Sequence, residues 1–172
     1  MVVREDRKEQ ILDKAVAVFA EKGYYKATTA LVAKAAGVTQ PYVFHFFKNK
    51  EELFNAVIDR AVGRLYDTFM QVEAPADQLA ESMGKAFKQI LQTNRDEMIM
   101  VMQAHAISEP AIRMHVREKF RLMNEVFIAK FEAAGMPNPR AAAGHFLSIG
   151  LLITLSDVLE LPELLQCEKG CI

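Results

Sequence analysis

Residues 28–47, which read TTALVAKAAGVTQPYVFHFF, contain two short amphipathic helices separated by one glycine, and this segment constrains the fold most. Thr28 and Thr39 each precede a stretch with helical periodicity and are good helix N-caps, because a threonine hydroxyl accepts a backbone N–H. Gly37 lies between the two stretches and supplies the turn. The apolar positions predict one seam along which the two helices pack: Val32, Ala33, Ala36, Val38, Val43 and Phe47.

Helical spacing of apolar residues continues along the rest of the chain, without the alternation that is typical of strands. Glycines, prolines and N-cap residues divide the chain into about eight helices. The expected helices cover 6–21, 28–36, a short segment from Thr39, 49–71, 76–93, 95–107, 109–134 and 138–160, with a leucine-rich tail at 162–166. The predicted fold is all-α: residues 1–50 form a three-helix head with a helix-turn-helix, and residues 51–172 form a helical bundle.

Charge is distributed unevenly between these two parts. Residues 1–50 contain 9 Lys and Arg against 5 Asp and Glu, whereas residues 51–172 contain 12 against 17. A basic head on an acidic body is typical of a protein that meets phosphate groups with one end only.

Cysteine usage and hydropathy indicate the cellular compartment in which we expect the protein. Cys167 and Cys171, both in the last six residues, do not form a disulfide framework and favour a cytosolic protein. The charged N-terminus does not resemble a signal peptide. The most apolar run, 146–155, is interrupted by polar residues and is too short to span a bilayer. We therefore expect a cytoplasmic protein without membrane association.

The second short helix of the predicted helix-turn-helix presents polar and aromatic groups on its outer face. These residues are Thr39, Gln40, Tyr42, His45 and Phe46. Such groups reach base edges and phosphates in the major groove, which indicates double-stranded DNA as the partner. A helical hairpin in an unrelated bundle has the same shape, and it remains the alternative interpretation.

The ordered motifs of residues 7–54 resemble the TetR/AcrR family of bacterial one-component regulators. The motifs are Gly23-Tyr24, Ala27-Thr28-Thr29, Val32-Ala33, Ala36-Gly37-Val38-Thr39 and the run YVFHFFKNKEEL from Tyr42 to Leu53. Residues 55–172 match the family only in length and helical texture. The resemblance implies a ligand-responsive transcriptional regulator that is not an enzyme and that usually represses.

The resemblance implies a set of DNA-contacting residues: Thr28, Thr29, Thr39, Gln40, Pro41, Tyr42, His45, Lys48 and Lys50. Thr28 is expected to cap the second helix and place backbone N–H groups on phosphate. Gln40 and Tyr42 are expected to face base edges, and His45 faces a base or the backbone unless it is only a surface residue. The two lysines are expected to meet phosphate.

The chain departs from the family at several of these positions. Phe44 and Phe46 stand where the family commonly has Tyr or His, which removes a donor worth about 0.5–1.5 kcal/mol at each position. Phe46 is alternatively a core residue. Ala30 and Leu31 replace residues that are usually polar. DNA affinity is therefore expected to depend on lysines, namely Lys26, Lys34, Lys48 and Lys50, and to fall steeply with salt.

Methionine and phenylalanine are abundant in the body, and a cavity lined by them accommodates varied apolar ligands. The resemblance implies such a cavity, in which an apolar or amphipathic small molecule moves the fourth helix and spreads two heads. The candidate ligand contacts are Phe87, Met98, Met102, Gln103, His105, Phe120, Met123 and Phe127. Ordinary core packing is the alternative for each Met or Phe, and a surface or capping role is the alternative for His105.

The helix expected at 138–160 is too apolar all round to face solvent. Pairing with 109–134 and with the same helices of a second chain buries it in an isologous four-helix bundle, although a central helix within a monomer is the alternative. Gly144, Ser148 and Gly150 allow close approach. The candidate interface residues are Leu147, Leu151, Leu152 and Leu155. A homodimer also fits a palindromic operator, because two heads read two half-sites.

A helical enzyme and a helical scaffold are the alternative classes. A di-iron bundle needs a glutamate three residues before a histidine, but those positions hold Tyr42, Met102, Ile112 and Ala142. Phosphate-loop, nucleophile-elbow and zinc-protease motifs do not occur in the sequence. We therefore expect no catalytic residue, metal or cofactor, and salt-dependent DNA binding separates a regulator from a scaffold.

Overall fold

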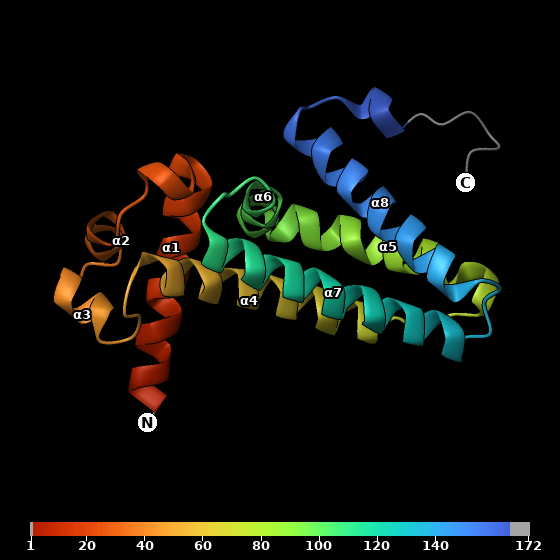
Figure 1. Cartoon of the computed structure of the whole chain (residues 1–172), viewed down its shortest axis with the longest axis horizontal. Helices are drawn as coiled ribbons and strands as arrows, with labels where there is room; N and C mark the ends of the chain where they lie inside the picture. Colours follow the sequence, from red (N-terminus) through yellow and green to blue (C-terminus); the bar gives the residue numbers. More distant parts are fainter. Residues whose placement is uncertain (1, 166–172) are drawn as a thin grey trace. The chain divides into compact units, whose positions relative to one another are not determined.

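The structure is a computed structural model that describes residues 2–165, and every regular element among them is helical (Figure 1). The elements are α1 (Val2–Lys26), α2 (Thr29–Ala35), α3 (Gln40–Phe44), α4 (Lys50–Met70), α5 (Ala76–Thr93), α6 (Arg95–Ala104), α7 (Pro110–Ala133), α8 (Pro139–Val158) and the 3-10 helix η1 (Pro162–Leu165). The all-α prediction is confirmed, and the expected helices from α2 to α8 agree with the observed bounds to within a few residues. Cys167 and Cys171 lie outside the described residues.

α1 extends beyond its expected end. The sequence predicts an end near Gly23, whereas the element continues to Lys26. Gly23 has φ 70° and ψ 165°, a conformation that is almost restricted to glycine, and it interrupts the helical backbone. The helix therefore breaks where predicted, but one further turn carrying Tyr24 and Tyr25 follows the break.

Packing divides the chain into two compact units, each of which is described by itself. The first contains the residues up to 62 together with 96–117, and the second contains 63–95 and the residues from 118 onward. α4 and α7 therefore contribute residues to both units. The predicted boundary at residue 50 concerns the division of function, and it stays a prediction.

The core of the first unit forms where α1, α2, α3 and the first half of α4 pack together. The ring of Phe54 lies 5.1 Å from the ring of Phe19 and 5.1 Å from that of Tyr24, centroid to centroid. Most of the predicted helix-turn-helix seam is buried: Val32, Ala33, Val43 and Phe47. Ala36 and Val38 are half-buried. The seam fixes α3 against α2 and leaves the other face of α3 at the surface.

Five phenylalanines form the core of the second unit: Phe69 of α4, Phe87 of α5, Phe127 and Phe131 of α7, and Phe146 of α8. Their neighbouring ring centroids are 5.1 to 6.4 Å apart. Gly150 faces this cluster, because a side chain there would meet Phe87 at 4.0 Å. Such a distance is an ordinary van der Waals contact, and the expectation that Gly150 allows close approach of a second chain stays a prediction.

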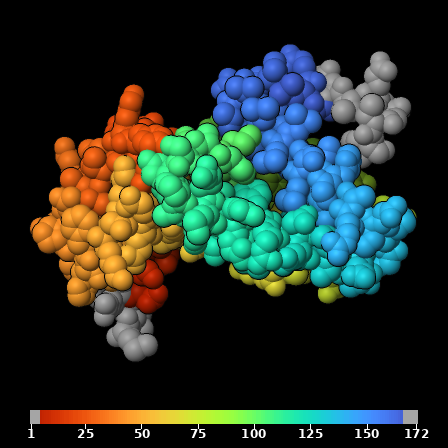
Figure 2. Space-filling model, viewed as in Figure 1, coloured from red at the N-terminus to blue at the C-terminus, as the bar shows by residue number. Residues whose placement is uncertain are grey.

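α8 is apolar but largely unburied. Its most apolar window has a mean hydropathy of 1.5, and only 22% of that window is buried within the chain. By length and composition alone the helix is able to cross a membrane, a test that helices of soluble proteins also pass. Figure 2 shows α8, in blue, at the surface of its unit.

Candidate nucleic-acid interface

The α2–turn–α3 segment has the local structure that its sequence predicts. The Thr28 hydroxyl accepts a hydrogen bond from the N–H of Leu31 at 3.2 Å, and the Thr39 hydroxyl accepts one from the N–H of Tyr42 at 3.3 Å. Both threonines are therefore N-caps. Gly37 has φ 66°, in the left-handed region that the turn requires. Pro41 lies in the first turn of α3, where a missing N–H is tolerated.

α3 presents one face to the core and the other to solvent. Val43 is fully buried, and Phe47 just beyond the helix is 2% exposed. The outward side chains are those of Gln40, Pro41, Tyr42, Phe44 and His45. The structure thus brings the predicted base-reading residues together on one surface, interrupted only by the buried Val43.

Thr29 and Gln40 are joined by a hydrogen bond that the sequence did not indicate. The amide Nε2 of Gln40 donates to the hydroxyl of Thr29 at 2.8 Å. Thr29 is only 7% exposed, although it was predicted to contact DNA. Thr29 therefore lies beneath the surface, and its hydroxyl holds the exposed side chain of Gln40.

Three rings lie together on the outer side of α3 and the turn after it. The Tyr42 ring is 6.4 Å from that of His45 and 5.4 Å from that of Phe46, and His45 and Phe46 are 5.5 Å apart. Phe46 is half-buried, which fits the alternative of a core residue, whereas Phe44 is 43% exposed. The outer surface of this segment is therefore aromatic as well as polar.

Lys50 is engaged by the protein itself. Its ammonium donates to the carbonyl of Tyr24 at 3.0 Å and to that of Ala27 at 3.4 Å, and it lies 4.1 Å from the centroid of the Tyr24 ring. A cation beside the last carbonyls of α1 also interacts favourably with the helix dipole. Burial, followed by the charges of Glu51 and Glu109, raises the pKa of Tyr24 to about 12, so the ring stays neutral.

Lys48, the other lysine predicted to meet phosphate, is exposed. Its backbone N–H donates to the Glu52 carboxylate at 2.9 Å, and the N–H of Glu52 donates to Asn49 Oδ1 at 2.7 Å. This reciprocal arrangement resembles a capping box and begins α4 immediately after the aromatic turn. The backbone before α4 is therefore fixed, while the Lys48 side chain remains available at the surface.

Replacing Lys50 with methionine is expected to lower the free energy of unfolding by about 1–3 kcal/mol, because two carbonyls lose a charged donor. Urea denaturation measures this change. Lys48→Met is the matched control: its stability is expected to stay within about 0.5 kcal/mol of the wild type. The Lys48 variant is expected instead to reduce the salt dependence of DNA binding by about one unit of slope. Unchanged stability of the Lys50 variant would contradict its structural role.

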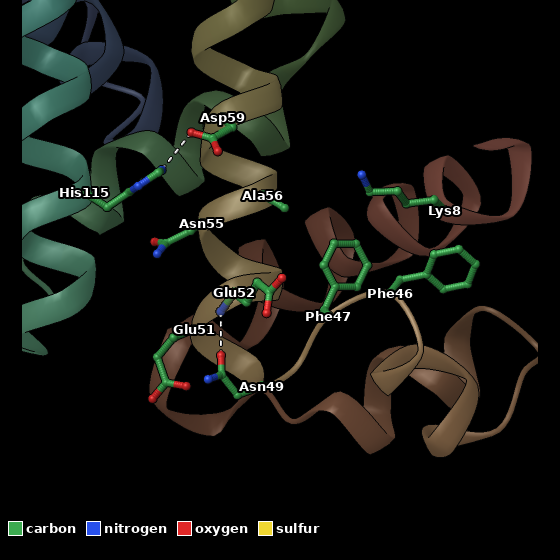
Figure 3. Close-up of a pocket in the computed structure, with 10 residues that line it drawn as sticks. All are labelled: Lys8, Phe46, Phe47, Asn49, Glu51, Glu52, Asn55, Ala56, Asp59 and His115. Carbon is green, nitrogen blue, oxygen red and sulfur yellow. Dashed lines mark hydrogen bonds and ion pairs between the residues drawn. The ribbon is translucent and has the colours of Figure 1, made fainter. Parts of the chain in front are cut away.

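A pocket of about 490 Å³ lies in the first unit beside this surface (Figure 3). Phe46 and Phe47 line it together with three carboxylates, those of Glu51, Glu52 and Asp59. The Asp59 carboxylate is 2.7 Å from Nε2 of His115, which also lines the pocket. Carboxylates repel phosphate, so the pocket is a poor site for the DNA backbone. Within residues 2–165, no three His, Cys, Asp or Glu side chains are grouped to hold a metal.

Arg60 on α4 joins three helices of the first unit. Its guanidinium donates to Glu9 at 3.1 Å and Asp13 at 2.8 Å, both on α1, and pairs with Glu97 on α6 at 2.9 Å. Burial alone would lower the pKa of Arg60, but these carboxylates raise it, so the guanidinium stays charged. Glu97 is 3% exposed. Sequence reasoning gave these residues no role, because they come from three separate helices.

The Tyr25 hydroxyl forms a second connection between α1 and the segment around α6 and α7. It donates to the Glu109 carboxylate at 2.7 Å and lies 2.8 Å from the Ser108 hydroxyl. It also accepts the Ser108 backbone N–H at 3.2 Å. Residues 108 and 109 are thus tied to the turn that follows Gly23.

The eight predicted ligand contacts fall in both units. Met98, Met102, Gln103 and His105 belong to the first, and Phe87, Phe120, Met123 and Phe127 to the second. Phe87 and Phe127 both pack on Phe69, with ring centroids 6.2 and 5.2 Å away. His105 is exposed, and Gln103 donates to the Ala20 carbonyl at 3.4 Å. Phe69 and Phe146 belong to the same aromatic cluster but were not among the predicted contacts.

Residues 11–57 match the family model for bacterial regulatory proteins of the tetR family. The uncharacterized HTH-type transcriptional regulator YhgD of Bacillus subtilis is 31% identical over 96 residues, which are 56% of this chain and 50% of the relative. The fatty acid metabolism regulator protein of Bacillus subtilis is 33% identical over 82 residues, 45% of this chain and 42% of the relative.

A solved structure shares the fold over most of the chain. The transcriptional regulator FadR from Bacillus subtilis, in complex with stearoyl-CoA, has a TM-score of 0.69 and 21% identity and covers 88% of each chain. The chain spans about half the length of the curated relatives it matches. Residues 11–57 of this chain are thus the helix-turn-helix segment of the tetR family of bacterial regulatory proteins, as the N-terminal motifs predicted.

Proposed function

We propose that this protein is a ligand-responsive transcriptional repressor that binds a palindromic operator as a homodimer in the cytoplasm. A small molecule entering the body releases the operator. The observation that carries the proposal is the buried helix-turn-helix seam, which holds Gln40 and Tyr42 of α3 and its C-cap His45 outward. The protein acts by binding and not by catalysis.

The operator contacts follow from the positions of these side chains. Gln40 and Tyr42 read base edges in the major groove, while His45 and Lys48 contact the backbone near them. The first turn of α2, capped by Thr28, offers backbone N–H groups to phosphate. Thr39 and Pro41 shape the beginning of α3. Lys50 contributes a positive field from its place beside α1, and Thr29 acts through Gln40.

The dimer forms through the unburied side of α8. Exposed residues recur along this helix at spacings of three and four: Ala141, Gly144, Ser148, Leu151, Leu155 and Val158. Such spacing produces an apolar seam for a second helix. Leu151 and Leu155 lie on the seam, whereas Leu147 and Leu152 are half-buried at its sides. An isologous pairing with a second copy removes this seam from water and places two heads on two half-sites.

The effector is an apolar or amphipathic molecule, and long-chain acyl-coenzyme A is the class to test first. The Bacillus subtilis FadR structure, which shares this fold, holds stearoyl-CoA. In this chain the aromatic core of the second unit includes Phe87 and Phe127 from the candidate ligand set. An acyl chain that separates these rings from Phe69 replaces ring contacts with contacts of the same apolar kind.

The test uses the full chain and a pool of random duplex DNA. Selection is expected to yield an inverted repeat, bound with an affinity that falls as salt rises. Gln40→Ala and Tyr42→Ala are each expected to weaken binding by about 1–3 kcal/mol in a gel shift and to relax base preference. A chain that selects no sequence, or two variants that bind as the wild type does, would refute the proposed readers.

The same complex then tests the effector. Stearoyl-CoA is expected to release the selected operator, and coenzyme A without an acyl chain is expected to leave it bound. Release by coenzyme A alone would assign recognition to the nucleotide part and contradict the apolar site. An operator complex that neither molecule disturbs would remove acyl-coenzyme A from the proposal.

A further inference from the structure

The hydrogen bond between Gln40 and Thr29 restricts how Gln40 meets a base. Thr29 begins α2 and is 7% exposed, whereas Gln40 begins α3 and is exposed. The donor is Nε2 of Gln40, and the distance to the Thr29 hydroxyl is 2.8 Å. A flexible side chain at the surface is thus anchored to a side chain that packing has already fixed.

The anchor changes the hydrogen-bonding capacity of the amide. A free glutamine amide offers two N–H donors and a carbonyl acceptor. Thr29 takes one of the two hydrogens, so the group that remains is one donor and one acceptor, side by side. The Gln40 amide that faces the groove is therefore a matched pair, with the N–H as donor and the carbonyl as acceptor.

Adenine is the base whose major-groove edge fits this pair. It presents N7 as an acceptor and the N6 amino group as a donor, and glutamine binds both at once. Guanine presents two acceptors, O6 and N7, and an amide needs both hydrogens to satisfy them. Because Thr29 occupies one hydrogen, guanine leaves the Gln40 carbonyl facing an acceptor.

We propose that Thr29 is a positioning residue that makes Gln40 specific for adenine in each half-site of the operator. This inference rests on the proposed function, and it adds the identity of one base and the reason for it. Thr29 itself does not touch DNA. It acts by accepting the second amide hydrogen of Gln40, which would otherwise be free to donate to guanine.

The experiment uses the full chain and the operator selected from random DNA. Each position of the half-site is changed in turn, and the position that loses discrimination in Gln40→Ala is taken as the one that Gln40 reads. The wild type is expected to prefer adenine over guanine there by about 5-fold to 150-fold. Replacing that adenine with 7-deazaadenine, which lacks N7, or with 2-aminopurine, which lacks the N6 amino group, is expected to weaken binding.

Two variants separate positioning from a general structural role. Thr29→Val keeps the shape but removes the hydroxyl, and it is expected to reduce the preference for adenine over guanine to about 3-fold or less, mainly by improving binding to guanine. Thr29→Ser restores the hydroxyl and is expected to recover the preference. Circular dichroism and thermal melting establish that both variants are folded.

Three outcomes overturn the inference. Equal loss of binding to all four bases in Thr29→Val would make Thr29 only structural. Preference for guanine, cytosine or thymine at the position read by Gln40 would contradict the matched pair. Failure to select any DNA would remove the proposed function itself, and it differs from the first two results because no base preference exists to measure.

Discussion

Substituting aspartate for Leu155 is expected to separate the proposed dimer into single chains. Leu155 is 38% exposed in the single chain and lies on the seam of α8, so the substitution leaves the chain's own core intact. In a symmetric pair it places two carboxylates in a desolvated interface, where unpaired charge is strongly unfavourable. We expect at least about 3 kcal/mol of lost association energy, which raises the dissociation constant more than a hundredfold.

Sedimentation velocity over a range of concentrations measures this change. Tyr66→Asp is the control, because Tyr66 is similarly exposed, at 43%, but lies on α4. That variant is expected to remain a dimer. Charge at Leu152 is also expected to break the pair, but Leu152 is half-buried in its own chain, so Leu155 gives the cleaner result. A Leu155→Asp protein that sediments as the wild type does would place the interface elsewhere.

Arg60→Met is expected to lower the free energy of unfolding of the first unit by about 3–5 kcal/mol. The methionine retains the apolar stem but removes the charge that faces Glu97, whose side chain is 4% exposed. Loss of the guanidinium removes one ion pair that offsets the desolvation penalty of this buried carboxylate. Guanidinium chloride denaturation, followed by helical circular dichroism, measures the loss.

Single neutralisations on α1 are the controls. The side chains of Glu9 and Asp13 are 50% and 63% exposed, so solvent screens their attraction to Arg60. Glu9→Gln and Asp13→Asn are each expected to change stability by no more than about 1 kcal/mol. The double variant Arg60→Met with Glu97→Gln is expected to recover part of the loss. A loss below about 1 kcal/mol in Arg60→Met alone would contradict a buried ion pair.

Sequence alone predicted the helices well because their ends are local. Thr28 and Thr39 cap the helices that they precede, and Gly37 makes the turn, using atoms no more than a few residues away. The outward face of α3 followed from the same local periodicity. The last turn of α1 was not predicted, because a break at Gly23 and an end at Gly23 have the same sequence signal.

The partners of the functional residues were not predictable in the same way. Lys50 bonds carbonyls more than twenty positions earlier, and Gln40 bonds Thr29 across the turn. Periodicity indicates which face of a helix is buried, but it does not indicate which side chains of another helix that face contacts. Arg60 and Glu97 likewise needed the packing of α4 against α6 to be recognised as a pair.

The break at Gly23 allows the last turn of α1 to move relative to the rest of the helix. Two sets of hydrogen bonds hold the turn after it. Lys50 on α4 donates to the Tyr24 carbonyl, and the Tyr25 hydroxyl bonds Ser108 and Glu109. Three residues beyond Tyr25 stands Thr28, the cap from which α2 begins. A displacement of residues 108 and 109 must therefore either break these hydrogen bonds or move residues 24–28 and the beginning of α2, with the backbone bending at Gly23.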